Sequence, residues 1–220
     1  ITEDEAKDFD TILSKAKVAF SLQNSWYING FYDGLSLFGE KGNDADAGMV
    51  FPKDGADITS YLVDVVANPN FSNDDGASGL AAIKDGSADV LFSGTWSAKD
   101  VKEALGDNYA ATSLPTFTVN GQKKQMKSFA ATKAAAYNPN AKNPKAAAQF
   151  AAYLGSTEAQ KLHYEMRAIP PTDKSLSDLT TDDVAAKAQA DTMANTALLQ
   201  SGLSGMNDWW TPAETCLLYT

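Results

Sequence analysis

Apolar side chains in the first half of the chain alternate between helical spacing and short continuous runs. Residues 6–16 carry an apolar side chain every three or four positions, behind a capping-box pattern of Thr2 and Glu5, which predicts an amphipathic helix. The run 17–20 predicts a short strand, and the aromatic-rich segment 25–38 predicts a second helix. The same rules predict helices over 58–66, 79–84 and 98–105, a buried strand over 89–92 and a loop over 39–55.

Proline and glycine divide the second half of the chain. Strands are predicted over 109–114 and 127–137, on either side of Pro115 and the Asn120-Gly121 turn pair. Helices are predicted from Asn143-Pro144 to Gly155, after a cap at Ser156, from Thr181 towards Leu199, and again from Trp209, with Ile169-Pro170-Pro171 extended between them. Short strands that alternate with helices favour an α/β architecture.

The composition is that of a folded globular protein, because 44% of the 220 residues are hydrophobic and 21% are charged. The net charge is −10 with only 18 Lys and Arg residues, so the sequence offers no basic cluster for nucleic acid or for an anionic membrane surface. The sequence has no apolar run of the ~20 residues that a transmembrane helix needs, and Ile1 opens without a signal-peptide pattern. We therefore expect an intracellular protein or a processed form of an exported one.

Candidate catalytic and metal-binding residues are scarce. Cys216 and His163 are the single residues of their types, which excludes an internal disulfide and a Cys or His metal cluster and removes the commonest general base. The acidic segments 44–46 and 73–76 lack the bidentate Glu of a calcium loop, so they are interpreted as ordinary turns. Nucleotide-binding, nucleophile-elbow and zinc-helix motifs are missing from the sequence. We predict no catalytic residue, no metal and no cofactor.

Carboxylate pairs are the remaining basis for an enzymatic reading. Glu103 with Asp107, or Asp182 with Asp183, would have to face one glycosidic bond at a defined separation to act as a glycosidase dyad. With 28 acidic residues in the chain, such pairs arise by chance. They are interpreted as solvated surface acids.

Three segments place tryptophan beside helix breakers and polar groups. They are Ser25-Trp26-Tyr27, Gly94-Thr95-Trp96 and Asn207-Asp208-Trp209-Trp210. Sugar rings have apolar C–H faces edged by hydroxyl groups, so an aromatic platform with nearby amides and carboxylates suits them. Core packing at helix starts is the alternative for any one of these residues. Three such places together favour carbohydrate binding.

Several segments, in chain order, resemble the maltose/maltodextrin-binding proteins, the receptors of sugar ABC importers. Residues 20–27 resemble the family segment in which a polar residue and an aromatic residue at a helix start meet the sugar, and residues 92–96 resemble the strand-to-helix turn whose Trp stacks on a glucose ring. The similarity continues through residues 114–117, 127–155, 169–171 and 206–210. The resemblance implies an α/β, type II periplasmic-binding-protein-like fold, an extracellular location as a cell-surface lipoprotein or periplasmic protein, and no catalysis.

The resemblance also implies roles for individual residues. It makes Trp26, Trp96 and Trp210 stacking platforms, Asn24 a hydrogen-bonding neighbour, and Tyr27 and Met206 pocket walls. Asn24 stands where some relatives have a carboxylate, and Glu214 falls where a basic residue is expected, so both positions weaken the implied site. The implied partners are maltose or a maltodextrin and, in the intact protein, a membrane ABC permease.

The similarity covers mainly the second lobe of a two-lobed receptor. Residues 1–130 and 180–220 correspond to that lobe, and residues 131–179 to a segment of the first lobe. The opposite wall of the sugar site has no counterpart in the sequence, so we expect weak or absent sugar affinity. The stranded segment is expected to expose apolar surface and to promote self-association. Residues 216–220 fit neither the family's helix nor a natural cap, which suggests a truncation or an altered reading frame near Ala213.

Two other functions remain open at this point. The first is a carbohydrate-active enzyme, which turnover of a maltooligosaccharide would reveal. The second is a protein-interaction module that uses exposed Trp209 and Trp210 as anchors. Quenching of tryptophan fluorescence by sugars, but not by candidate proteins, separates that module from a sugar receptor.

Overall fold

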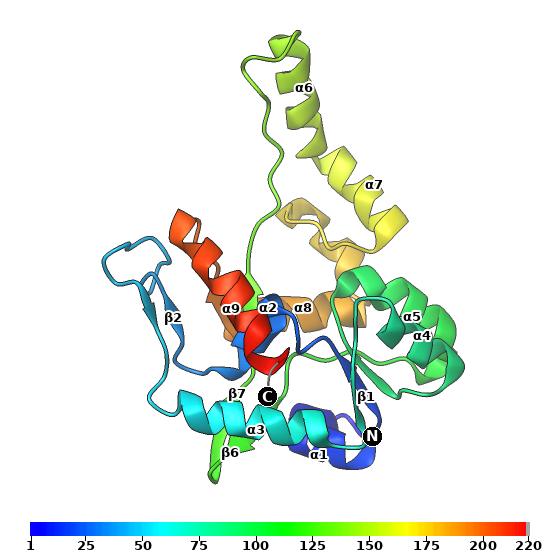
Figure 1. The fold of residues 1–220 in the computed structure, drawn as a ribbon. Coiled ribbons are helices and arrows are strands. Elements are labelled where there is room, and N and C mark those ends of the chain that lie inside the picture. The colour runs from blue at the N-terminus through cyan, green and yellow to red at the C-terminus, as the bar shows by residue number, and fades with distance from the viewer. Residues whose placement is uncertain (219–220) are drawn as a thin grey trace.

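The computed structural model describes residues 1–218 as a mixture of short strands and helices (Figure 1). The strands are β1 (Val18–Phe20), β2 (Ser36–Leu37), β3 (Met49–Val50), β4 (Phe71–Asn73), β5 (Val90–Phe92), β6 (Thr116–Val119), β7 (Gln122–Gln125), β8 (Ser128–Ala130) and β9 (Ala197–Leu199). The α-helices are α1 (Phe9–Lys15), α2 (Ser25–Ile28), α3 (Gly55–Ala67), α4 (Ser78–Asp85), α5 (Ala98–Leu105), α6 (Pro144–Leu154), α7 (Thr157–Arg167), α8 (Val184–Asn195) and α9 (Asn207–Leu218). Short 3₁₀ helices include η1 (Glu5–Lys7), η2 (Asn29–Phe31), η3 (Thr95–Ser97) and η6 (Ser204–Met206).

A parallel sheet with the strand order β4-β1-β5 confirms the predicted α/β architecture. Val18 in the central strand pairs with Phe71 on one side and with Val90 on the other. Parallel neighbours need long crossover connections, and helices α3 and α4 lie in the connections that lead to β4 and β5. Because all three strands run in the same direction, their carboxyl ends meet at one edge of the sheet.

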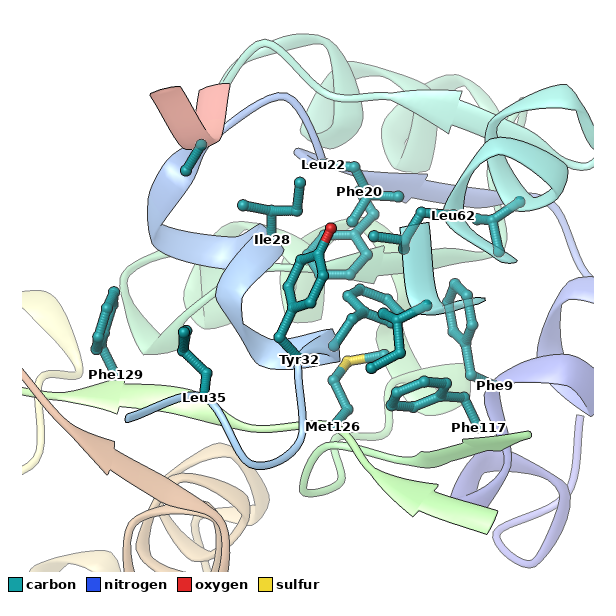
Figure 2. Packing of buried hydrophobic residues seen from close by; sticks show 14 of the residues in the cluster. Phe9, Phe20, Leu22, Ile28, Tyr32, Leu35, Leu62, Phe117, Met126 and Phe129 are labelled. Atoms are coloured by element: carbon teal, nitrogen blue, oxygen red, sulfur yellow. The ribbon is translucent and has the colours of Figure 1, made fainter. Parts of the chain in front are cut away.

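One hydrophobic cluster joins this sheet to the helices and to the hairpin β6–β7. Phe9 lies 5.7 Å from Phe31 and 5.4 Å from Phe92 between ring centroids, in edge-to-face contacts. Figure 2 shows Phe9, Phe117 and Met126 within this cluster. Burial of a side chain of this size stabilises the fold by roughly 1.5–3 kcal/mol. The shared core therefore holds the sheet, and with it the carboxyl edge of its strands, in place.

The predicted helix over 25–38 is wrong beyond its first turns. Helix α2 ends at Ile28 and is followed by η2, after which Ser36–Leu37 pairs with Met49–Val50 as an antiparallel ribbon. Gly34 has φ +90° and Phe38 has φ +62°, a left-handed conformation that a continuing helix excludes. The apolar spacing was compatible with a helix, but the strand pairing across the 39–48 loop determines the structure.

The strand predictions in the middle of the chain need correction. Residues 109–114 form no strand; the hairpin lies at β6 and β7, around Asn120 and Gly121 with φ +50° and +75°. The predicted strand 127–137 is ordered as a strand only over Ser128–Ala130, because β9 offers just three residues as its parallel partner.

Helix boundaries near the C-terminal end also differ from the prediction. Helix α8 ends at Asn195, before Leu199, since residues 197–199 are the partner strand of β8. Helix α9 continues to Leu218, so the segment that begins at Cys216 is helical as far as it is described, and Tyr219 and Thr220 lie outside the described residues.

Helices α6 and α7 project away from the other elements (Figure 1). The Ser156 cap is confirmed, because its hydroxyl oxygen accepts a hydrogen bond from the Ala159 N–H at 3.2 Å. None of residues 131–184 is buried. The exposed apolar side chains of this segment include Tyr137, Phe150, Tyr153, Leu154, Leu162 and Met166. No helix within residues 1–218 has both the length and the apolar character needed to cross a membrane.

Candidate functional site

The carboxyl edge of the parallel sheet carries two of the aromatic segments. Helix α2 with Trp26 follows β1, and η3 with Trp96 follows β5, the strand next to β1. In open α/β sheets, ligands bind outside the carboxyl ends of the strands. The topology therefore places both tryptophans at the edge where such a ligand is expected.

Asn24 and Ser25 attach α2 to the C-terminal helix α9. The Asn24 side-chain oxygen accepts from the Trp26 N–H at 2.8 Å and caps α2. The Ser25 hydroxyl donates to Glu214 Oε1 at 3.0 Å, and the Trp209 indole N–H donates to the Ser25 carbonyl oxygen at 3.2 Å. Glu214, which stands where the resemblance leads one to expect a basic residue, thus has a structural partner in α2.

Trp26, Trp210 and Phe129 form a cluster of three aromatic rings. Trp26 and Trp210 are nearly parallel, with centroids 6.4 Å apart and an interplanar angle of 14°. Phe129 contacts both, at 5.1 Å from Trp26 and 5.8 Å from Trp210. Phe129 is buried, whereas both tryptophans are half-buried and retain accessible surface. The cluster therefore has a fixed base and a polarisable apolar surface.

Phe129 is a site residue that sequence reasoning missed. It lies in β8, within the segment predicted as a long strand. The pattern of apolar and polar residues around it does not indicate that its ring contacts α2 and α9. Only the folded arrangement brings β8 beside α2.

Trp96 differs from the clustered tryptophans in its exposure. It is 57% exposed, the highest value for any tryptophan in the chain. The turn that carries it is closed by a hydrogen bond from the Ser97 N–H to the Gly94 carbonyl oxygen at 3.0 Å. An exposed indole on a defined turn is a ready surface for stacking.

Tyr27 lies half-buried against Phe20, with ring centroids 5.8 Å apart in an edge-to-face contact. Burial raises the pKa of the Tyr27 hydroxyl, and the negative charge of Asp74 raises it further, so the hydroxyl is a proton donor at neutral pH. Asp74 is itself buried and accepts from the N–H groups of Gly76 and Gly79 at 2.9 and 2.8 Å. This acidic turn thus organises the start of α4.

Two residues singled out from the sequence lie in the core. Met206 is 3% exposed, so it has little surface with which to touch a ligand directly. Trp209 is 4% exposed, which contradicts the interaction module that was to use it as an exposed anchor. Among the side chains that the structure describes, those of residues 1–215, no group of three or more His, Cys, Asp or Glu could hold a metal ion.

Trp209→Phe is expected to destabilise the fold by about 1 kcal/mol, because it removes the bond to the Ser25 carbonyl oxygen while it keeps an aromatic ring in the core. Urea denaturation followed by circular dichroism measures the change. Trp210→Phe is the matched control, since this ring is half-buried and packs against other rings. Equal losses in the two variants would contradict the role given to the Trp209 hydrogen bond.

Comparison with known proteins identifies the class to which this fold belongs. The family model for bacterial extracellular solute-binding proteins matches residues 1–193. The chain belongs to this family. Its α/β fold is accordingly part of the type II periplasmic-binding-protein fold.

Solved structures support the same assignment. A protein determined with acarbose is 39% identical, with a TM-score of 0.91 over 98% of this chain and 58% of that one. The maltodextrin-binding protein MalE1 from L. casei BL23 is 23% identical, with a TM-score of 0.78 over 99% of this chain and 60% of its own. The maltotriose-binding protein from Thermus thermophilus is 16% identical, with a TM-score of 0.71 over 96% and 59%.

The chain spans about three fifths of the length of these structures. No protein with a curated description matches it.

Proposed function

We propose that the chain is the carbohydrate-binding part of a receptor for an ABC sugar importer, and that it takes a maltooligosaccharide. The observation that carries the proposal is the three-ring cluster of Trp26, Phe129 and Trp210 beside the α2 cap, on the carboxyl edge of the sheet. Family membership supports it, and so does the similarity to a maltodextrin-binding protein, a maltotriose-binding protein and a protein determined with acarbose. The corresponding location is the cell surface or periplasm, and the membrane permease is the partner of the whole receptor.

The proposed contacts divide between ring faces and polar groups. Trp26, Trp210 and Trp96 present ring faces to the apolar faces of the sugar units. Because the Asn24 oxygen caps α2, Asn24 contacts a sugar hydroxyl chiefly through its Nδ2 donor. The Tyr27 hydroxyl adds a donor. Met206 acts only from the core cluster on which Trp210 packs.

We further propose that residues 1–130 and 180–220 make one lobe and that residues 131–179 belong to another. The large core cluster draws its members from residues 9–129 and 206–213, and none from the segment between 131 and 184. The chain leaves the first set of elements after β8 and returns with α8, which contacts β8 and η3, before β9 pairs in parallel with β8. In this arrangement the sugar site has one wall in the chain and one wall outside it.

The proposed receptor breaks no bond. Of the acid pairs considered for a glycosidase, Asp183 has structural partners: one of its carboxylate oxygens accepts from the N–H groups of Ala185 and Ala186 at 2.9 and 3.0 Å, and the other accepts from the Tyr164 hydroxyl at 2.9 Å. These bonds hold the start of α8. An acid fixed in this way is poorly placed to shuttle protons to a glycosidic bond.

Calorimetry and tryptophan fluorescence with maltose, maltotriose and longer maltodextrins test the proposal. We expect a saturable response with a dissociation constant on the order of a millimolar, since in the proposed arrangement one wall of the site lies outside the chain. Lactose is the control disaccharide, and the maltooligosaccharide should be recovered unchanged. If the folded chain shows no response to any of these sugars, the proposed sugar site is wrong. If its affinity is submicromolar, the proposal that one wall of the site lies outside the chain is wrong.

A further inference from the structure

Gly94 lies directly beneath the indole of Trp96. A Cβ atom at position 94 would lie 2.2, 2.4 and 2.5 Å from three adjacent carbons of the six-membered ring. Carbon atoms in contact are normally 3.5–4.0 Å apart, so any side chain at this position would overlap the ring. The near equality of the three distances means that the Cβ would lie over the ring face and not at its edge.

The backbone at Gly94 does not itself require glycine. Its φ of −112° and ψ of 178° are extended values that any residue adopts. Gly86, by contrast, closes α4 with φ +78°, where a side chain is strained. The Trp96 ring therefore explains the glycine at position 94, because the ring fills the space that a side chain there would occupy.

Trp96 has one ring face covered by the backbone and most of its remaining surface exposed, as a stacking platform requires. One ring face lies on the Gly94 backbone, and the residue as a whole is still 57% exposed. Hydrogen bonds across the turn, from the Ser97 N–H to the Gly94 oxygen and between the Ser93 and Ser97 hydroxyls, are both 3.0 Å long. A ring that already rests on a fixed backbone loses less rotamer freedom when a ligand stacks on its open face.

We propose that Gly94 is a positioning residue for the carbohydrate site: it holds the Trp96 indole flat on the backbone with one face open to the sugar. This inference rests on the proposed function. An alanine at position 94 fits the local backbone, so it displaces the ring and leaves the fold intact. We expect Gly94→Ala to weaken sugar binding about tenfold, the scale of one lost aromatic contact, as Trp96→Ala does.

A double-mutant cycle separates positioning from a general effect on the fold. Gly94→Ala is made in the unsubstituted chain and in Trp96→Ala, and affinity for maltotriose is measured in all four proteins. If Gly94 acts through the ring, its substitution weakens binding in the first background and has no effect in the second. An equal loss in both backgrounds, or no loss in the first, would overturn the proposal.

A readout without ligand tests the same geometry. In the unsubstituted chain, Gly94→Ala should raise the acrylamide quenching of tryptophan fluorescence and alter the near-ultraviolet circular dichroism. When Gly94→Ala is added to a chain that already carries Trp96→Ala, it should cause neither change. Gly202→Ala is the matched control, because a Cβ there meets nothing within 4 Å. If none of the four proteins of the cycle responds to sugar, the proposed function fails, and the quenching measurement alone tests whether Gly94 positions the Trp96 ring. Unchanged quenching in Gly94→Ala would then overturn it.

Discussion

Trp26→Ala is expected to abolish the sugar-induced change in tryptophan fluorescence. The substitution removes a ring that contacts both Phe129 and Trp210, at centroid distances of 5.1 and 6.4 Å, and so takes away one of the three rings of the cluster. The sugar loses the stacking contact that Trp26 is proposed to make, and one aromatic contact contributes about 0.5–1.5 kcal/mol, so we expect binding to weaken by up to about tenfold. Fluorescence titration with maltotriose measures the change.

The variant must also be shown to fold. Trp26 is half-buried against the core cluster, so we expect Trp26→Ala to cost about 2 kcal/mol of stability and to keep its far-ultraviolet circular dichroism. Trp26→Phe should retain part of the sugar response, because a smaller ring still stacks. Tyr137→Ala removes an exposed aromatic residue outside the site and should leave the response unchanged. A full response from Trp26→Ala would place the sugar elsewhere.

The parts of the fold that depend on local rules could be predicted from the sequence. The strand at β1, the helices near α3 and α4, and the cap at Ser156 follow from residues close to one another in the chain. The pairing of β8 with β9 could not be predicted, since 66 residues lie between Ala130 and Ala197 and three-residue strands have no pattern of their own. Loop closure over such a separation is decided by the whole core.

The candidate site shows the same division. The three tryptophan segments are visible in the sequence because tryptophan stands there beside polar groups and breakers, and the resemblance to the family singles out Trp26, Trp96 and Trp210 within them. The different environments of Trp209 and Trp210 were not visible, because adjacent residues on a helix point about 100° apart and only tertiary packing says which one faces the core. Phe129 and the ring contact above Gly94 are likewise products of tertiary structure.

Self-association through α6 and α7 is the second expected result with a large effect. Phe150, Tyr153 and Leu154 follow at i, i+3 and i+4 along α6, and all three are exposed. Leu162 and Met166 are spaced by four residues on α7 and are also exposed. Helices of 11 residues are marginal in water without an apolar face to pack on. A second copy of the chain supplies such a face.

The charge of this segment does not oppose a second copy as the partner. Residues 144–167 contain three basic and two acidic side chains, so two copies of the segment meet with little repulsion although the whole chain carries −10. We propose that the chain forms a dimer through this segment. Light scattering coupled to size exclusion, at increasing concentration, should show the mass rising from that of the 23.4 kDa monomer towards twice that value.

Phe150→Ser together with Met166→Ser should raise the dimer dissociation constant by more than about tenfold, because each buried apolar side chain contributes roughly 1.5–3 kcal/mol. Val66→Ser is the control, since Val66 is an exposed apolar residue near the end of α3, outside the proposed contact. If Val66→Ser weakens the dimer equally, the contact lies elsewhere on the chain. A monomeric mass for the unsubstituted chain at high concentration would refute self-association, because the exposed face of α6 and α7 would then be stable in water.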